Sequence, residues 1–226
     1  MDMEGALAYL SDLERHNDRT WFHDTKARRL EAQRAFEGLL ADLIERIGAF
    51  DPSVRGQDPK SLTFKLPRDT RFSRDKSPYN PSLRAHIGPA GKLPVPVGYY
   101  LMVQPGGRSF LGGGLFSPQF KDATARIRRA IADRGDEWER IVDDPAFAER
   151  FRVEGEALKR VPPGFEPDHP QAAWLKHKSW YIECRQADEE VASPGFPASA
   201  AEAFERMQPF NAFLNRALEG FEMPQR

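Results

Sequence analysis

Apolar residues recur at helical spacing in several parts of the chain. The most regular run covers residues 24–47, where apolar side chains follow the i, i+3, i+4, i+7 pattern with charged residues between them. Gly48 and Pro52 end this helix, because glycine tolerates a left-handed cap and proline cannot continue the hydrogen-bond ladder. Ser117 and Pro118 are typical of a helix start. The other predicted helices cover residues 2–14, 117–133, 136–142, 145–151 and 198–218.

The middle of the chain changes to the alternating pattern of half-buried strands. Residues 98–104 are apolar on both faces and predict a central strand, which a Pro-Gly-Gly turn joins to the next one. Most of the strands follow one another without helices between them, and parallel pairing would need long crossovers. We therefore predict an α+β fold, with a mainly antiparallel sheet of about five strands packed against several helices in a single domain of residues 1–226. The predicted strands are residues 62–66, 83–87, 98–104, 108–115 and 174–185.

Composition narrows the class of protein. The 226 residues are 40% hydrophobic and 30% charged, which is typical of a globular chain. A formal net charge of -1 gives no global attraction to nucleic acid or to an anionic membrane. The one cysteine, Cys184, excludes an internal disulfide framework and fits a reducing compartment, so we expect a cytoplasmic protein. The N-terminus lacks the pattern of a signal peptide and no run of 18 apolar residues occurs, so we expect no membrane partner.

The most unusual stretch is residues 68–79, which interleaves cations and acids around Phe72 and ends in Ser-Pro-Tyr. Six cations and two acids lie between residues 65 and 84. Arginine forks suit carboxylate and phosphate groups, so this stretch could hold an anionic ligand. The alternative is an internal salt-bridge clasp, in which the acids neutralise the cations. The candidate ligand-binding residues here are Arg68, Asp69, Arg71, Ser73, Asp75, Lys76 and Tyr79.

Other residues could also carry chemistry. Three glycines before a predicted helix resemble an anion site, but a bulged strand or a close backbone crossing explains them better. His169 is a candidate general acid or base, or else a hydrogen-bonded structural histidine. No His-x-x-x-His pair occurs, so a metal site is not indicated. The further candidate ligand-binding residues are His16, Asn17, Lys26, Tyr99, Gly113, Gly114, Lys176 and Lys178.

These motifs together resemble the bacterial and fungal family of unknown function numbered 2461. The resemblance runs over nearly the whole chain, and its most specific part is the arginine motif of residues 68–79. It implies no particular activity, ligand, cofactor or catalytic residue. The resemblance leads us to expect Lys-Thr-Asn after Tyr79, whereas this chain has Asn80-Pro81-Ser82, so a cation next to the motif is missing. If that lysine binds an anion in relatives, this protein would bind one less well. The other motif residues are His16, Asn17, Trp21, Phe22, Lys26, Tyr99, Tyr100, Gly112, Gly113, Gly114, Gly164, Phe165, Asp168, His169, Pro170 and Lys176.

Three functions are compatible with this sequence. The first is a binding site, enzymatic or not, for a small molecule with a phosphate or carboxylate group, where Tyr79 or Tyr99 stacks on the ligand and His169 transfers protons. The second is a module that binds nucleic acid or an acidic partner, which the near-zero net charge disfavours. The third is a salt-bridged clasp in an interaction protein. The sequence indicates neither a cofactor nor an oligomeric state.

Overall fold

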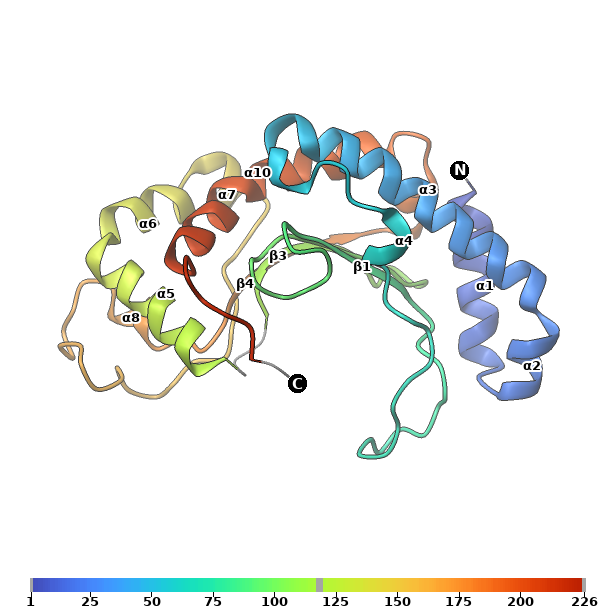
Figure 1. The fold of residues 1–226 in the computed structure, drawn as a ribbon, viewed down its shortest axis with the longest axis horizontal. Helices are drawn as coiled ribbons and strands as arrows, with labels where there is room; N and C mark the ends of the chain where they lie inside the picture. The colour runs from blue at the N-terminus through green and yellow to red at the C-terminus, as the bar shows by residue number, and fades with distance from the viewer. Residues whose placement is uncertain (1, 117–119, 225–226) are drawn as a thin grey trace.

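An antiparallel sheet lies at the centre of the computed structural model, which describes residues 2–116 and 120–224 (Figure 1). Its strands in the described residues are β1 (Leu83–Ile87), β2 (Tyr99–Val103), β3 (Ser109–Leu115) and β4 (Trp180–Gln186). They pair in the order β1-β2-β3-β4, and every pairing is antiparallel. The α+β fold predicted from the sequence is confirmed.

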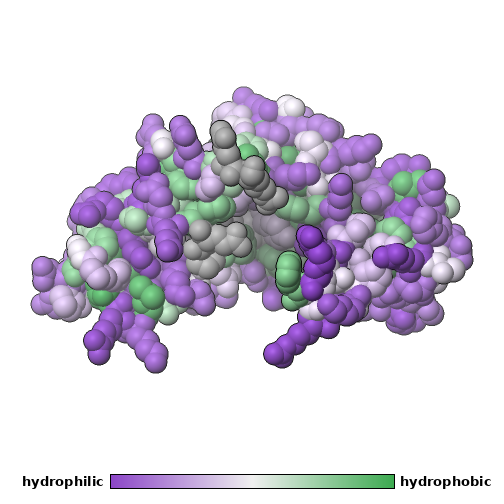
Figure 2. Space-filling model, turned by 60° about the horizontal axis from the view of Figure 1, so that its bottom comes forward, coloured by the Kyte–Doolittle hydropathy of each residue, from purple (hydrophilic) through white to green (hydrophobic). Residues whose placement is uncertain are grey.

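The helices of the described residues cover one face of the sheet (Figure 1). The long helices α3 and α10 pack on that face, while α1 and α2 lie at one end of the molecule and α5, α6 and α8 at the other (Figure 1). The opposite face is open, and Figure 2 looks onto that side and shows a hollow between hydrophilic flanks. The described helices are α1 (Met3–Arg15), α2 (Arg19–Asp24), α3 (Lys26–Phe50), α4 (Pro59–Leu62), α5 (Lys121–Asp133), α6 (Gly135–Val142), α7 (Pro145–Ala148), α8 (Ala172–Leu175), α9 (Asp188–Ala192) and α10 (Phe196–Ala217), with a 3-10 turn at Pro52–Val54.

Strand alternation separates a buried face from an open one. The side chains of Ile87, Leu101, Leu111 and Ile182 are fully buried against the helices. Gly113 lies on the same face, where a Cβ atom would come within 2.9 Å of Asn211 Oδ1 on α10. This glycine is therefore required by the close crossing of strand and helix, as the sequence indicated.

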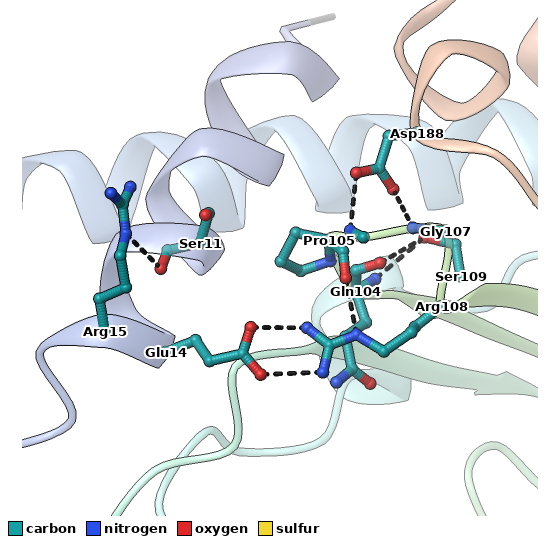
Figure 3. A network of polar contacts seen from close by, with 10 residues as sticks. Ser11, Glu14, Arg15, Gln104, Pro105, Gly107, Arg108, Ser109 and Asp188 are labelled. Carbon is teal, nitrogen blue, oxygen red and sulfur yellow. Dashed lines mark hydrogen bonds and ion pairs between the residues drawn. The ribbon is translucent and has the colours of Figure 1, made fainter.

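A polar network holds the β2–β3 hairpin against the neighbouring helices (Figure 3). Asp188, at the start of α9, accepts hydrogen bonds from the amides of Gly106 (2.7 Å) and Gly107 (3.0 Å) in the turn. Arg108 forms a two-pronged ion pair with Glu14 of α1, at 2.8 and 2.6 Å. These contacts fix β2 and β3, whose open-face side chains form part of the candidate site.

The sequence prediction differs from the structure in a few elements. The strand predicted over residues 62–66 is reduced to a bridge between Thr63 and Ala85, because α4 occupies residues up to Leu62 and the chain then leaves the sheet. The Ser117-Pro118 helix start lies outside the described residues, and α5 is described from Lys121. No helix in the described part of the chain is long and apolar enough to cross a membrane.

Candidate ligand-binding site

Residues 67–79 form an arm that projects from the edge of the sheet beside its open face (Figure 1). A bridge between Pro67 and Tyr79 closes its base, where Arg68 N also donates to Pro78 O at 2.9 Å. Phe72 lies in the outer part of the arm with 96% of its surface exposed. The basic segment singled out in the sequence is therefore a projecting element rather than the wall of a pocket.

The cations of the arm are bound largely within the arm itself. Arg71 Nη2 lies 2.6 Å from Asp69 Oδ2, and Arg68 pairs with Asp75. Lys76 Nζ donates to a backbone carbonyl of the arm at 2.9 Å. Because these ion pairs are exposed to solvent, each contributes little to stability, but together they define the shape of the arm. This arrangement is the one expected of an internal clasp.

The base of the arm is clamped to the N-terminal helices. The side-chain amide of Asn17 donates to Tyr79 O at 2.9 Å and accepts from Tyr79 N at 3.0 Å, as a neighbouring strand would. The rings of Phe22 and Tyr79 stack with centroids 3.7 Å apart, and the Arg29 guanidinium lies 4.0 Å from the Phe22 centroid. Two motifs that are far apart in the sequence thus meet in one structural unit.

The open face of the sheet contains a cavity of about 290 Å³ at the foot of the arm, which we call the open-face cavity. Tyr100 on β2 and Glu183 on β4 both pair with Gly112 on β3, and both side chains line the cavity. The rings of Phe116 and Phe110 lie over Gly112, where a Cβ atom would come within 3.0 Å of Phe116 Cζ and 3.4 Å of Phe110 Cε2. The cavity is lined by Phe64, His86, Lys92, Pro94, Tyr100, Phe110, Gly114, Phe116 and Glu183.

Four of the nine residues that line the cavity carry phenyl or phenol rings: Phe64, Tyr100, Phe110 and Phe116. Tyr100 stacks on Phe110 with centroids 5.6 Å apart, and Phe116 stacks on Tyr181 at 4.8 Å. Tyr100 also lies 5.7 Å from Phe116 and 6.2 Å from Phe64. Such a wall suits a planar ligand, because aromatic groups gain from stacked and edge-on contacts beyond the area that they bury.

His86 is held in one orientation at this cavity. Its Nδ1 atom lies 3.1 Å from the carbonyl oxygen of Gly91. A carbonyl can only accept, so Nδ1 carries the proton and Nε2 is an acceptor. Burial lowers the pKa of His86 to about 4, so the imidazole is neutral near pH 7.

Two charged residues in or beside the cavity are incompletely paired: Glu183 lines it, whereas Arg84 lies over the ring of the lining residue Phe64. Arg84 Nη2 donates to Lys65 O at 3.2 Å, but its buried Nε has no hydrogen-bond partner. The carboxylate of Glu183 accepts no hydrogen bond from the described residues, and Arg185 Nη2 lies 3.7 Å away. Burial raises the pKa of Glu183, with only partial opposition from Arg185. Unpaired charges of this kind are typical of sites that bind a ligand.

Comparison with known proteins places this chain in a family. The model of the family described as "Conserved hypothetical protein (DUF2461)" matches residues 5–213. The chain belongs to this family. The resemblance drawn from its motifs is thereby confirmed, and the match includes the arm, the Asn17 clamp and the open-face cavity. Neither the search of the curated proteins nor that of the solved structures gave a match.

The candidate residues named from the sequence do not form one group in this family member. Tyr99 points into the core, where its hydroxyl donates to Asp51 Oδ2 at 2.9 Å, whereas Gly114 lines the open-face cavity. His169 lies in the lobe of α6 and α8, at a separate cavity of about 260 Å³, and its Nδ1 accepts from Gln171 N at 3.0 Å. The remaining positions are Lys178, paired with Glu156 at 3.0 Å, half-buried Lys176, exposed Lys26, exposed His16 stacked on Trp21, and Ser73 beside Arg68 in the arm.

Sequence reasoning missed the polar residues of the open face. Arg84, His86, Tyr100 and Glu183 each interrupt an apolar strand at a position that points away from the helices. The alternation of the strands carried this signal, since the polar positions of neighbouring strands come together on one face.

Proposed function

We propose that this protein binds a small planar molecule with a carboxylate or phosphate group in the open-face cavity. The supporting observation is an aromatic-lined cavity of about 290 Å³ with a few fixed polar groups, which is the usual composition of small-molecule sites. The proposed site thus lies on the sheet rather than on the arm, and the ligand class is the one inferred from the sequence.

The charges around the cavity support one orientation of the ligand. Lys92 lines the cavity, and Arg84 on β1 adds positive charge beside it, 5.8 Å from the ring centroid of the lining residue Phe64. Glu183 provides an acceptor on the β4 side. A polar group that is partly buried without a partner costs free energy, which a complementary ligand group recovers. We therefore place the acid group of the ligand toward Arg84 and a hydrogen-bond donor toward Glu183.

The other two hypotheses receive different support. Three of the arm cations that would bind nucleic acid, Arg68, Arg71 and Lys76, are engaged by Asp75, Asp69 and a backbone carbonyl. A cavity of about 290 Å³ accommodates a single ring system rather than a polymer. The clasp hypothesis is compatible with a ligand site, because the arm can be a structural clasp while the sheet binds the ligand.

The test is a thermal-shift titration with 4-hydroxybenzoate, benzoate, phenol and adenosine monophosphate. We expect 4-hydroxybenzoate to stabilise the protein more than benzoate, which lacks the donor, and more than phenol, which lacks the acid. A ligand at about 100 times its Kd adds about 2.7 kcal/mol to the free energy of unfolding. Arg84→Met should reduce the stabilisation by the ligands that carry an acid group and leave that by phenol unchanged. Arg19→Met, at an exposed site on α2, should leave the stabilisation by every ligand unchanged. Failure of all four molecules to stabilise the protein would refute the proposal.

A further inference from the structure

Glu183 differs from the structural carboxylates of this protein. Asp188 accepts two backbone amides, and Glu14 is held by both prongs of Arg108. Glu183 has 22% of its side chain exposed, yet it accepts no hydrogen bond from the described residues. A carboxylate that only stabilised the fold would be expected to have such donors, because burying a charge without them is costly.

We propose that Glu183 is the catalytic acid–base residue of an enzyme that moves a proton on a planar substrate bound in the open-face cavity. This inference rests on the proposed function, since the cavity must admit a planar ligand. Glu183 is fixed on β4 and lines the open-face cavity together with Tyr100 on β2, so a planar substrate in the cavity would contact both side chains. Groups held on strands keep the geometry that proton transfer requires.

The surroundings of Glu183 suit reversible protonation. Burial is the main cause that raises its pKa above the ordinary 4.5, Arg185 opposes this, and Glu154 reinforces it. A carboxylate with a raised pKa is a stronger base than an exposed one. The titratable or charged groups around it are Arg185 and Tyr181 on β4, Glu154 on the adjoining segment, Tyr100 on β2, His86 on β1 and Lys92 at the cavity rim.

The test uses 5-nitrobenzisoxazole, a planar probe with one acidic C–H bond. The Glu183 carboxylate takes this proton, the C–H electron pair forms the third bond of a nitrile, and the ring N–O bond breaks to release a phenolate. No other reactant is consumed, and the carboxylic acid then returns its proton to water. The coloured phenolate is measured by absorbance, so the rate can be followed directly.

We expect the protein to convert the probe about 100-fold faster than Glu183→Gln, in the range of general acid–base effects. The rate should fall as the pH is lowered through the pKa of Glu183, with a midpoint above 4.5. Glu154→Gln is the second variant. It should remain active but shift this midpoint to lower pH, because a neighbouring negative charge has been removed. If Glu183 had a purely structural role, the pH midpoint of the reaction rate would not shift in Glu154→Gln.

If Glu183→Gln converts the probe at the same rate as the unmodified protein, the proposal is overturned. The unfolding temperatures of these two proteins are compared to show that both are folded. A midpoint that does not move in Glu154→Gln also overturns the proposal. The proposed function is judged separately by the 4-hydroxybenzoate titration. Stabilisation by that ligand without turnover of the probe would reject catalysis by Glu183 and leave the binding site in place.

Discussion

The clamp between Asn17 and Tyr79 allows a quantitative test of how the arm is held. Asn17→Ala removes two hydrogen bonds of 2.9 and 3.0 Å and leaves the N–H and C=O groups of Tyr79, a residue only 8% exposed, without these partners. Each bond contributes about 1 kcal/mol net, and the unpaired buried groups add to the loss. The free energy that keeps the arm base closed should therefore fall by about 2–3 kcal/mol. The amide of Asn80, which donates to Leu66 O at 2.8 Å, reports on this closing.

Hydrogen exchange at Asn80 is the assay. A loss of about 2–3 kcal/mol corresponds to roughly 30- to 150-fold faster exchange, if the amide exchanges through local opening of the arm base. Arg19→Ala, at an exposed position on α2, is the matched control and should leave the exchange rate unchanged. Unchanged exchange in Asn17→Ala would refute the clamp, because the arm base would then be held by other contacts.

Three further predictions concern the hairpin, the strand–helix crossing and a buried histidine. Asp188→Ala should lower the free energy of unfolding in urea by about 1–2 kcal/mol, since two turn amides lose their acceptor; an unchanged midpoint contradicts this. Gly113→Ala should cost about 1–3 kcal/mol because its Cβ would lie 2.9 Å from Asn211 Oδ1. Gly195→Ala should be nearly neutral, because its Cβ would make an ordinary contact of 3.9 Å with Ser193 Oγ; equal effects would contradict the close crossing. The pKa of His86 is lowered to about 4 in the folded protein, against 6.5 when exposed. The neutral histidine therefore contributes up to about 3 kcal/mol to the free energy of unfolding above pH 6.5, and this contribution is lost as the pH falls toward 4. His86→Gln should flatten the dependence of the urea-derived free energy of unfolding on pH between 6.5 and 4.

The sequence predicted the fold well where the pattern was regular. The helix predicted over residues 24–47 is formed as α3 and the β2–β3 hairpin is formed as predicted, because their apolar spacing and turn residues agree with their tertiary packing. The predicted end at Gly48 was wrong, since α3 begins at Lys26 and continues through Gly48 to Phe50. Residues 62–66 alternate like a strand but form only one bridge, since α4 ends at Leu62 and the arm begins soon afterwards. Alternation in so short a segment cannot distinguish a strand from an extended connection.

The candidate site was less accessible to sequence reasoning. The charges of the arm are dense along the chain, but Arg68 and Arg71 are paired with acids within seven and two residues of them. The polar residues of the open face are spread over three strands, and their proximity depends on the register that pairs Tyr100 with Gly112. Spatial grouping of this kind depends on tertiary structure, which no local pattern specifies.

A crystal structure of the protein with bound 4-hydroxybenzoate would test the central claim most directly. We predict electron density for the ring beside Tyr100 and Phe116, with the carboxylate toward Arg84 and the hydroxyl group toward Glu183. Density on the arm beside Arg71, or in the separate cavity beside His169, with an empty open-face cavity, would contradict the account.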